Sequence, residues 1–332
     1  MNRDLGILTL AALFALGATA TRAGAQEDLA KSMRARYGAI FQPLPDAMPG
    51  SENDTAERIH LGEELYFETA LSANNTQSCN SCHRVDEGLG GVDNEPTSPG
   101  AFGARGDRNA PTTLNAGFHL AQFWDGRAAD LQAQAKGPIL NPVEMAMESE
   151  EAVLEKLGSM EGYPELFEKA FPDAEPAMTY DNLAEAIAAF ERTLVTHDRF
   201  DDFLGGDDEA LSEEELKGME KFVTTGCITC HQGPALGGMM YQKMGQINAY
   251  ANFIDKGRSA VTGNPAEDFF FKVPSLRNIA LTAPYFHDGG AATLEAAVQN
   301  MAWLQLGRKL AKEDVDQLVA FMHALTDKER AE

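Results

Sequence analysis

The pentapeptide Cys79-Asn80-Ser81-Cys82-His83 recurs in the second half of the chain as Cys227-Ile228-Thr229-Cys230-His231. Both stretches have the pattern C-x-x-C-H, and together they contain all 4 cysteines of the 332-residue sequence. Other segments recur in the same order: Gly90-Gly91 as Gly237-Gly238, Pro111–Asn115 (PTTLN) as Pro274–Asn278 (PSLRN), and Trp124–Leu131 (WDGRAADL) as His287–Leu294 (HDGGAATL). Segments that repeat in one order predict a duplicated domain.

The C-x-x-C-H spacing is typical of covalent haem attachment. Two thiols three residues apart on a helical turn can add to the two vinyl groups of one haem, and the adjacent His then reaches the iron. A redox dithiol and a four-cysteine zinc site are the alternatives. A dithiol does not explain a His after both motifs, and zinc does not explain the secretory start described next. The motifs therefore predict two haem c groups, with His83 and His231 as proximal ligands.

The N-terminus has the pattern of a secretory signal. A mostly apolar run from Leu5 to Ala20 follows residues 2–4 and ends in the small residues Ala23-Gly24-Ala25, an A-x-A-type cleavage site. A run of about 16 residues is shorter than the roughly 20 that a spanning helix needs. We therefore expect residues 1–25 to be a signal peptide, and the mature protein to lie in the periplasm, or outside a cell without an outer membrane.

The charge balance limits the kinds of partner. The chain has 27 Lys and Arg against 51 Asp and Glu, a net charge of −24. Nucleic-acid binding needs clustered cations, so this balance argues against it. It favours solubility and allows a protein partner with a basic face. A hydrophobic fraction of 44% and 23% charged residues are typical of a globular protein, and the length favours about two domains.

The hydrophobic pattern predicts a mainly α fold with long loops. Apolar residues at helical spacing predict helices over 181–195 and 313–325. Ser212 and Glu215 form a capping box, and Asp54 resembles the N-cap of an earlier helix. The Gly- and Pro-rich stretches predicted as loops are 84–117, 136–144 and 232–290. The acidic segment 197–208 (HDRFDDFLGGDD) is predicted to be a linker between domains at 26–196 and 209–332.

Over roughly residues 50–326 the chain resembles the bacterial di-haem cytochrome c peroxidases. The matching stretches, in order, are CNSCH with LGGVD, RNAPTTLNAGFHLAQFWDGR, QAKGP, PVEM, the second CxxCH, PSLRN, PYFHDG and AVQNM. The resemblance implies two tandem cytochrome-c-like helical domains, each with one covalent haem near their interface. The first domain would hold the peroxidatic haem and the second the electron-transfer haem. The C-terminal helix could pack back on the first domain.

The resemblance also implies roles for single residues. Met301 matches the distal ligand of the second haem. Glu144 matches the distal carboxylate of the peroxidatic haem, with Gln134 as its amide neighbour, and a base there would move the proton of bound peroxide. Trp124 matches the aromatic residue between the two haems.

A calcium ion between the domains is a further implication of the resemblance. Asn109, Thr282 and Pro284 match its ligands, and an amide oxygen with two backbone carbonyls suits a hard cation.

One loop departs from the family pattern. Many members carry a His before the R-N-x-P-T segment, which caps the first haem until the second is reduced; Ala101 stands at that position, and no His lies between His83 and His119. We therefore expect the first haem to have water or nothing on its distal side, so that no reductive activation is needed. A shifted ligand such as His119 is the alternative.

The function implied by the resemblance is reduction of H2O2 to water with electrons from a small soluble monohaem cytochrome c or a cupredoxin. Family resemblance also suggests a homodimer. Two alternatives remain open. One is a non-catalytic di-haem electron-transfer protein. The other is a protein-modifying enzyme similar to the tryptophan tryptophylquinone maturation enzyme, although that enzyme closes its second haem with Tyr where Met301 stands here.

Overall fold

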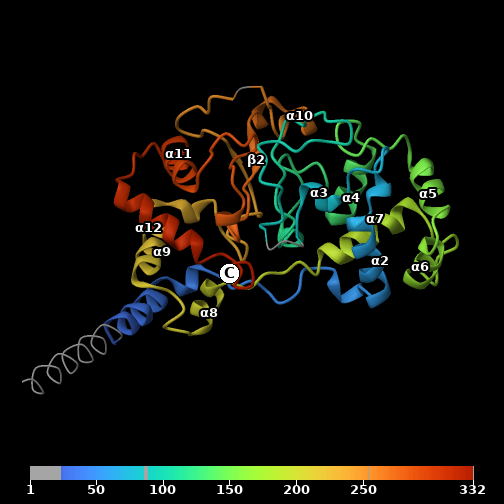
Figure 1. Cartoon of the computed structure of the whole chain (residues 1–332). Coiled ribbons are helices and arrows are strands. Elements are labelled where there is room, and N and C mark those ends of the chain that lie inside the picture. The colour runs from blue at the N-terminus through green and yellow to red at the C-terminus, as the bar shows by residue number, and fades with distance from the viewer. Residues whose placement is uncertain (1–23, 86–88, 253, 332) are drawn as a thin grey trace, which may run out of the picture.

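The computed structural model describes residues 24–85, 89–252 and 254–331, and they form two helical halves side by side (Figure 1). The mainly α prediction is confirmed: in the described residues the named strands are β1 (Tyr241–Lys243) and β2 (Phe270–Lys272), an antiparallel pair with Tyr241 opposite Lys272. None of the helices described is long and apolar enough to cross a membrane. Most of the predicted signal peptide, residues 1–23, lies outside the described residues.

The first half is built on the pairing of two long helices. Its helices are α2 (Ala56–Phe67), α3 (Cys79–Cys82), α4 (Leu131–Leu140), α5 (Glu150–Gly158), α6 (Tyr163–Ala170) and α7 (Tyr180–Glu191). Helix α7 confirms the helix predicted over 181–195. The N-cap of α2 is Thr55 rather than Asp54, because Asp54 instead pairs with Arg192. A Cβ on Gly62 of α2 would strike the carbonyl of Ala186 on α7, so the glycine permits close contact.

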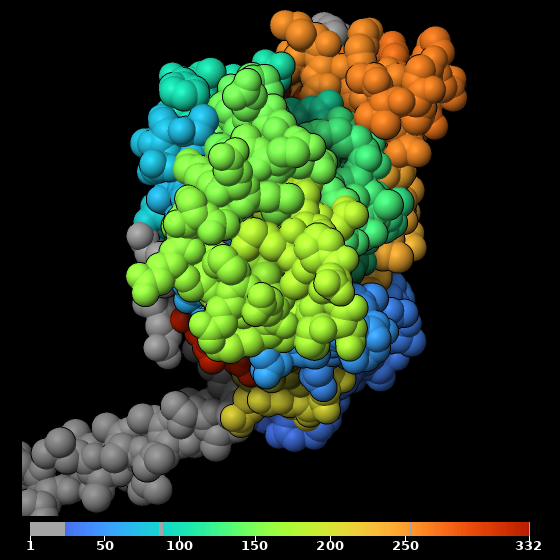
Figure 2. Space-filling view, turned by 90° about the vertical axis from the view of Figure 1, so that its right-hand side faces the viewer, coloured from blue at the N-terminus to red at the C-terminus, as the bar shows by residue number. Residues whose placement is uncertain are grey.

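The second half repeats this arrangement. Its helices are α8 (Arg199–Gly205), α9 (Glu213–Thr225), α10 (Ser259–Thr262), α11 (Leu294–Leu306) and α12 (Lys312–His323). Helix α9 begins at the predicted capping box of Ser212 and Glu215. It packs on α12, and a Cβ on Gly218 would strike the carbonyl of Gln317. Figure 2, which faces the first half, shows that the segment around α10 projects at the top, beside that half.

Short 3-10 turns complete the chain: Gly38–Ile40, Ser51–Asn53, Thr69–Leu71, Ala116–Phe118, Cys227–Thr229, Pro265–Glu267 and Ile279–Leu281. The predicted loop at 136–144 is helical over 136–140, because α4 continues through Pro138 to Leu140 and buries Ala135 and Ile139, and it is irregular from Asn141 onward.

The sequence repeats have matching backbone geometry. Asn115 and Asn278 both have left-handed backbones, with φ of 62° and 61°, and so do Phe123 and Phe286, with φ of 65° and 76°. After each of these segments a helix starts, α4 in the first half and α11 in the second. Asn tolerates this region of φ better than most residues. The halves thus repeat local structure as well as sequence.

The predicted domain boundaries differ from the observed packing. Ala30, Met33, Tyr37 and Phe41 pack in the core of the second half, although they fall in the segment 26–196 assigned to the first domain. The predicted linker 197–208 contains α8, whose Phe200 and Phe203 are fully buried in that same core. The apolar side chains decide this placement, because the acidic residues between them face outward or form ion pairs.

The C-terminal helix stays with the second half. Helix α12 packs on α9, and the residues after it reach the first half instead. There the Arg330 guanidinium donates to the carbonyls of Leu89 at 2.8 Å and Val85 at 3.2 Å.

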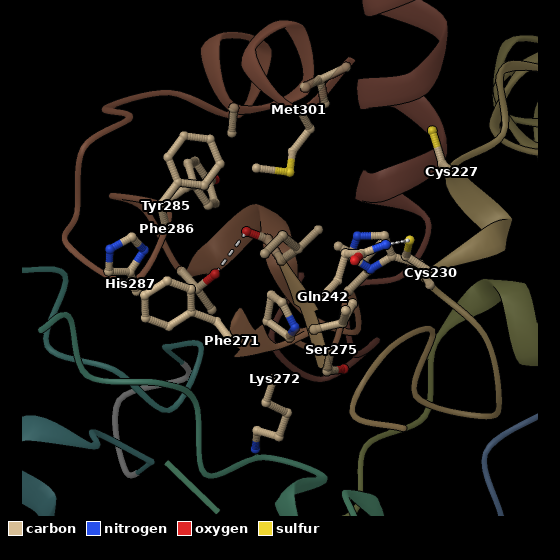
Figure 3. Close-up of a pocket in the computed structure, with 18 of the residues that line it drawn as sticks. Cys227, Cys230, Gln242, Phe271, Lys272, Ser275, Tyr285, Phe286, His287 and Met301 are labelled. Carbon is tan, nitrogen blue, oxygen red and sulfur yellow. Dashed lines mark hydrogen bonds between the residues drawn. The ribbon is translucent and has the colours of Figure 1, made fainter. Parts of the chain in front are cut away.

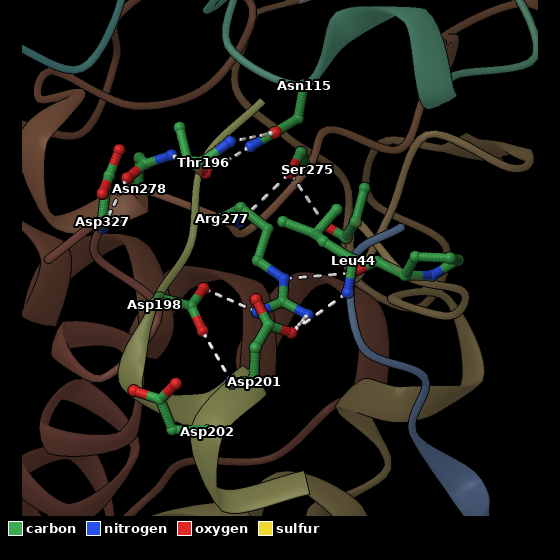
Figure 4. Close-up of polar contacts among 12 residues, drawn as sticks. Leu44, Asn115, Thr196, Asp198, Asp201, Asp202, Ser275, Arg277, Asn278 and Asp327 are labelled. Atoms are coloured by element: carbon green, nitrogen blue, oxygen red, sulfur yellow. Dashed lines mark hydrogen bonds and ion pairs between the residues drawn. The ribbon is translucent and has the colours of Figure 1, made fainter. Parts of the chain in front are cut away.

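A buried ion cluster holds the second half together (Figure 4). The fully buried Arg277 donates to Asp198 at 2.6 Å and to Asp201 at 2.9 Å, and its Nε donates to the carbonyl of Pro234 at 3.0 Å. Asp201 also accepts from the backbone N–H of Leu44 at 3.1 Å. One side chain therefore joins the N-terminal segment, α8 and the segment that repeats PTTLN.

We predict that Arg277→Met lowers the free energy of unfolding by about 3–5 kcal/mol, because it leaves two buried carboxylates without their cation. Lys328→Met is the control, since it removes an exposed pair with Asp202 and should cost less than about 1 kcal/mol. Chemical unfolding of both variants with their haems attached measures the difference. Equal losses would contradict a structural role for the Arg277 cluster.

Candidate functional site

A largely apolar cavity in the second half gathers the predicted ligands of the second haem (Figure 3). Cys227, Cys230, His231 and Met301 all line it, and Met301 extends into it from α11. Apolar side chains from several elements complete the wall: Phe222, Leu276, Val298, Leu318 and Met322. None of the 4 cysteines forms a disulfide, so each thiol is available for attachment.

The imidazole of His231 has the orientation and the protonation state that a metal ligand needs. Its Nδ1 lies 3.0 Å from the carbonyl oxygen of Leu236, which leaves Nε2 as the nitrogen available to an iron. Burial lowers the pKa of His231 to about 4, so the ring is neutral at pH 7. A neutral imidazole and a thioether in one apolar cavity beside a C-x-x-C pair fit a covalently bound haem with His and Met ligands.

The matching motif in the first half lies on a short helical turn. Helix α3 starts at a capping box of Ser78 and Ser81 and places Cys79 and Cys82 before His83. Burial lowers the pKa of His83, which keeps its imidazole neutral. The hydroxyl of the buried Tyr66 donates to the backbone carbonyl of His83 at 2.7 Å, which fixes the chain that carries the ligand.

Glu144 lines a separate, more polar pocket in the first half. The other lining residues are Phe123, Arg127, Ala128, Ala129, Ala133, Gly137, Pro138 and Asn141. Burial raises the pKa of Glu144, while the positive charge of Arg127 and a 2.8 Å hydrogen bond from Asn141 act to lower it. A carboxyl whose pKa is raised above its usual value is better able to accept a proton and later return it. Gln134 lies on the same helix, α4, but is not among the lining residues, so its predicted role remains a prediction.

The loop that lacks the family histidine packs directly against Glu144. The backbone N–H of Ala101 donates to the backbone carbonyl of Glu144 at 2.7 Å, and the side chain of Asn74 donates to the carbonyl of Ala101. The next residue, Phe102, is 69% exposed. The loop is therefore held next to Glu144 by backbone hydrogen bonding, and the match of Ala101 to the family histidine remains a prediction.

His119, the alternative ligand of the first haem, lies elsewhere. It lines the cavity that contains His231, and its Nδ1 is 3.0 Å from the Nζ of Lys272. It does not line the pocket of Glu144.

Trp124 lies between the two halves. Its indole N–H donates to the carbonyl of Asn109 at 2.9 Å, and its own carbonyl accepts from the backbone N–H of Lys272 at 2.7 Å. The indole packs edge-on against the ring of His287, with centroids 6.4 Å apart. This position suits a relay between haems, and that role remains a prediction.

The predicted calcium ligands Asn109, Thr282 and Pro284 all line the second-half cavity. The amide of Asn109 donates to the carbonyl of Glu95 at 2.9 Å, which orients the side chain. No cluster of three or more His, Cys, Asp or Glu side chains suited to a metal occurs in the described part of the chain. A calcium ion here would depend on neutral oxygen atoms, and it remains a prediction.

Sequence reasoning missed two charged residues that line these cavities. Arg127 is the last residue of W-D-G-R, and the second repeat has Gly290 at that position. This difference between the repeats was the sequence feature that could have identified Arg127. Lys272 is the one cation in the apolar run Phe270-Phe271-Lys272-Val273. A single charged residue within an apolar run indicates a buried charge.

Comparison with known proteins agrees with this geometry. Residues 56–209 match the family model described as di-haem cytochrome c peroxidase. The chain is 44% identical over 307 residues to the cytochrome c551 peroxidase of Pseudomonas aeruginosa, covering 90% of this chain and 88% of that protein. It is 49% identical over 289 residues to the cytochrome c551 peroxidase of Nitrosomonas europaea, covering 86% and 84%. The chain belongs to the di-haem cytochrome c peroxidase family.

As a member of this family it is an oxidoreductase that acts on peroxide and carries two haem c groups. Among solved structures, a MauG-like protein associated with microbial copper homeostasis matches with a TM-score of 0.77 and 27% identity, over 88% of this chain and 95% of that chain.

We predict that the double change Cys227→Ser with Cys230→Ser removes one haem and leaves the other attached, because Cys79 and Cys82 lie on α3 in the first half and are not among the residues that line the second-half cavity. Intact mass and haem quantification of the purified protein measure the loss. The matched control, Cys79→Ser with Cys82→Ser, should also leave one haem, held in the second-half cavity. Loss of both haems from either variant would contradict independent sites.

Proposed function

We propose that the chain reduces hydrogen peroxide to water at a haem held by His83, with electrons that pass through a second haem held by His231 and Met301. The main support for this proposal is the pocket of Glu144. It places a carboxyl group with a raised pKa beside the loop of Ala101. When bound, haem c would supply the binding of peroxide and the storage and transfer of electrons. The protein's residues position the peroxide and move its protons.

Glu144 would act as the general base and then the general acid. It would take the proton from the near oxygen of peroxide and return it to the far oxygen as that atom leaves as water. Asn141 donates to one carboxylate oxygen at 2.8 Å, so the other oxygen would be the one that takes the proton. Arg127 would favour the ionised form that accepts the first proton.

Ala101 would leave the distal side of the first haem open in both oxidation states. A methyl group cannot bind iron, and its loop is tied to Glu144 by backbone hydrogen bonding. We therefore propose that the enzyme reacts with peroxide without prior reduction of the second haem.

The electron donor would be a small soluble monohaem cytochrome c or a cupredoxin with a basic docking face. The net charge of −24 supports such a partner, and turnover should then fall as salt rises. The proposed location is the periplasm, reached through the N-terminal signal. Asn109, Thr282 and Pro284 would bind a calcium ion between the halves.

A second candidate function is modification of another protein. The chain is 32% identical over 93% of its length to the methylamine utilization protein MauG of Methylorubrum extorquens. An open first haem also suits such chemistry, whereas Met301 in the second cavity favours a peroxidase. A non-catalytic electron carrier is the third possibility, and it would show no reaction with peroxide.

The decisive experiment is EPR and optical spectroscopy of the fully oxidised holoprotein before and after one equivalent of H2O2. We expect one high-spin haem, one low-spin haem and an immediate reaction. Two low-spin haems that react only after half-reduction would contradict an open site. Fast reaction with poor turnover of cytochrome c would favour the protein-modifying alternative.

We predict that Ala101→His makes the first haem low-spin and abolishes the immediate reaction, which half-reduction should then restore. Phe102→His is the matched control, because its side chain is exposed and should leave the spectra unchanged. Identical spectra for the two variants would show that the loop does not place residue 101 over the haem.

We predict that Glu144→Gln lowers kcat/KM for peroxide by about 10²–10⁴-fold. Because Glu144 acts ionised, the rate should fall as pH drops through its pKa.

The positive charge of Arg127 lowers the pKa of Glu144. Arg127→Gln removes that charge, so the fall in rate at low pH should begin at a higher pH than in the unchanged protein; Arg127→Lys keeps the charge and should leave it in place. Stopped-flow rates measured over pH 4–9 test this prediction. If the pH dependence of Arg127→Gln equals that of the unchanged protein, Arg127 does not have this role.

A further inference from the structure

Lys272 is a buried cation without an anionic partner in the described part of the chain. Its residue is 5% exposed, and its Nζ makes one hydrogen bond, 3.0 Å long, to Nδ1 of His119. Lysine is almost never this buried unless it is paired. Burial pulls the pKa of Lys272 down to about 7, and no acidic group offsets that effect.

His119 does not supply the missing charge. Burial and the neighbouring Lys272 hold the pKa of His119 well below its usual range, so the imidazole is neutral. Its Nδ1 faces a donor, which places the ring proton on Nε2, and Nε2 is buried without a hydrogen-bond partner. The pair therefore presents N–H donors from both residues and no acceptor, an arrangement complementary to an anion.

The pair is held rigidly. A Cβ on Gly238 would strike the ring of His119, so the imidazole lies directly against the glycine backbone, which has φ of 79°. The carbonyl of Gly238 accepts from the N–H of Leu120 at 2.9 Å, and the N–H of Lys272 is bound to the carbonyl of Trp124 at 2.7 Å. Backbone hydrogen bonds thus hold both of the segments that carry these two side chains.

The pair lines the cavity that holds Cys227, Cys230 and His231. Figure 3 shows Lys272 away from both cysteines, with its ammonium directed toward the chain of the first half. A haem attached through its vinyl groups carries its two propionates on the opposite edge of the macrocycle. The only carboxylates that the cofactor brings into this cavity would therefore enter on the side away from the cysteines.

We propose that Lys272 and His119 form an anion site that binds a propionate of the haem in this cavity. The inference rests on the haem assignment made under Proposed function. A cation held at the propionate stabilises the reduced haem, which is more negative than the oxidised one by one charge. Lys272 would therefore help to set a high potential for the haem that receives electrons from the donor.

The test is a spectroelectrochemical titration of the holoprotein at pH 7 with Lys272→Met, Lys272→Arg and Lys243→Met. Lys243 lies on the paired strand β1 and does not line the cavity, so its variant removes one positive charge nearby without touching the site. We expect Lys272→Met to lower the equilibrium constant for reduction of the second haem at least tenfold, a shift of 59 mV for one electron. Lys272→Arg should stay within threefold of the unchanged protein.

A potential for Lys272→Met that equals that of Lys243→Met would overturn the proposal. If Lys272→Met fails to retain two haems, His119→Leu provides the same comparison, with a smaller shift in the same direction expected and no shift counting against the site. The peroxide reaction of the unchanged protein is recorded separately. Its absence would refute the proposed function, whereas the potentials alone decide the anion site.

Discussion

The hydroxyl of Thr196 joins the repeated asparagines of the two halves. It accepts a hydrogen bond from the amide of Asn115 at 2.8 Å and another from the amide of Asn278 at 3.1 Å (Figure 4). The backbone N–H of Thr196 binds Asn115 in turn, and that of Asp327 binds Asn278. All of these groups are buried, where hydrogen bonds are strong and an unmade bond is costly.

Local signals in the sequence predicted local structure well. The capping box at Ser212, the helix at 181–195 and the two C-x-x-C-H turns depend on residues close together in the chain, so their chemistry can be read directly. The repeats predicted the duplication, because equivalent positions such as Asn115 and Asn278 need the same unusual backbone.

Features that depend on tertiary packing were predicted less well. The segment 197–208 is rich in Asp, which suggested a linker, yet Phe200 and Phe203 at helical spacing give α8 a buried face. Helix α4 runs through Pro138 because burial of Ala135 and Ile139 outweighs the local preference against it.

The candidate sites show a similar division. Family resemblance supplied Met301 and Glu144, and the structure adds what surrounds each of them. The departure at Ala101 was visible in the sequence, but only the structure shows that its loop is tied to the backbone of Glu144. The sequence signals of Arg127 and Lys272 were weak, because what each residue does depends on distant parts of the chain that surround it.

The packing of residues 30–41 with the second half gives the chain an inserted topology. One folding unit is made of two separate pieces, the N-terminal segment and everything after Thr196, and the other is a continuous insert between them. The two ends of the insert lie close together: Arg192 near its C-terminal end donates two hydrogen bonds, of 2.6 and 2.7 Å, to Asp54 near its N-terminal end. An insertion with adjacent ends can be accommodated without disturbing its host. During synthesis, however, residues 30–41 emerge long before the C-terminal residues they pack against, so the core of the second half closes late, through contacts of high sequence separation.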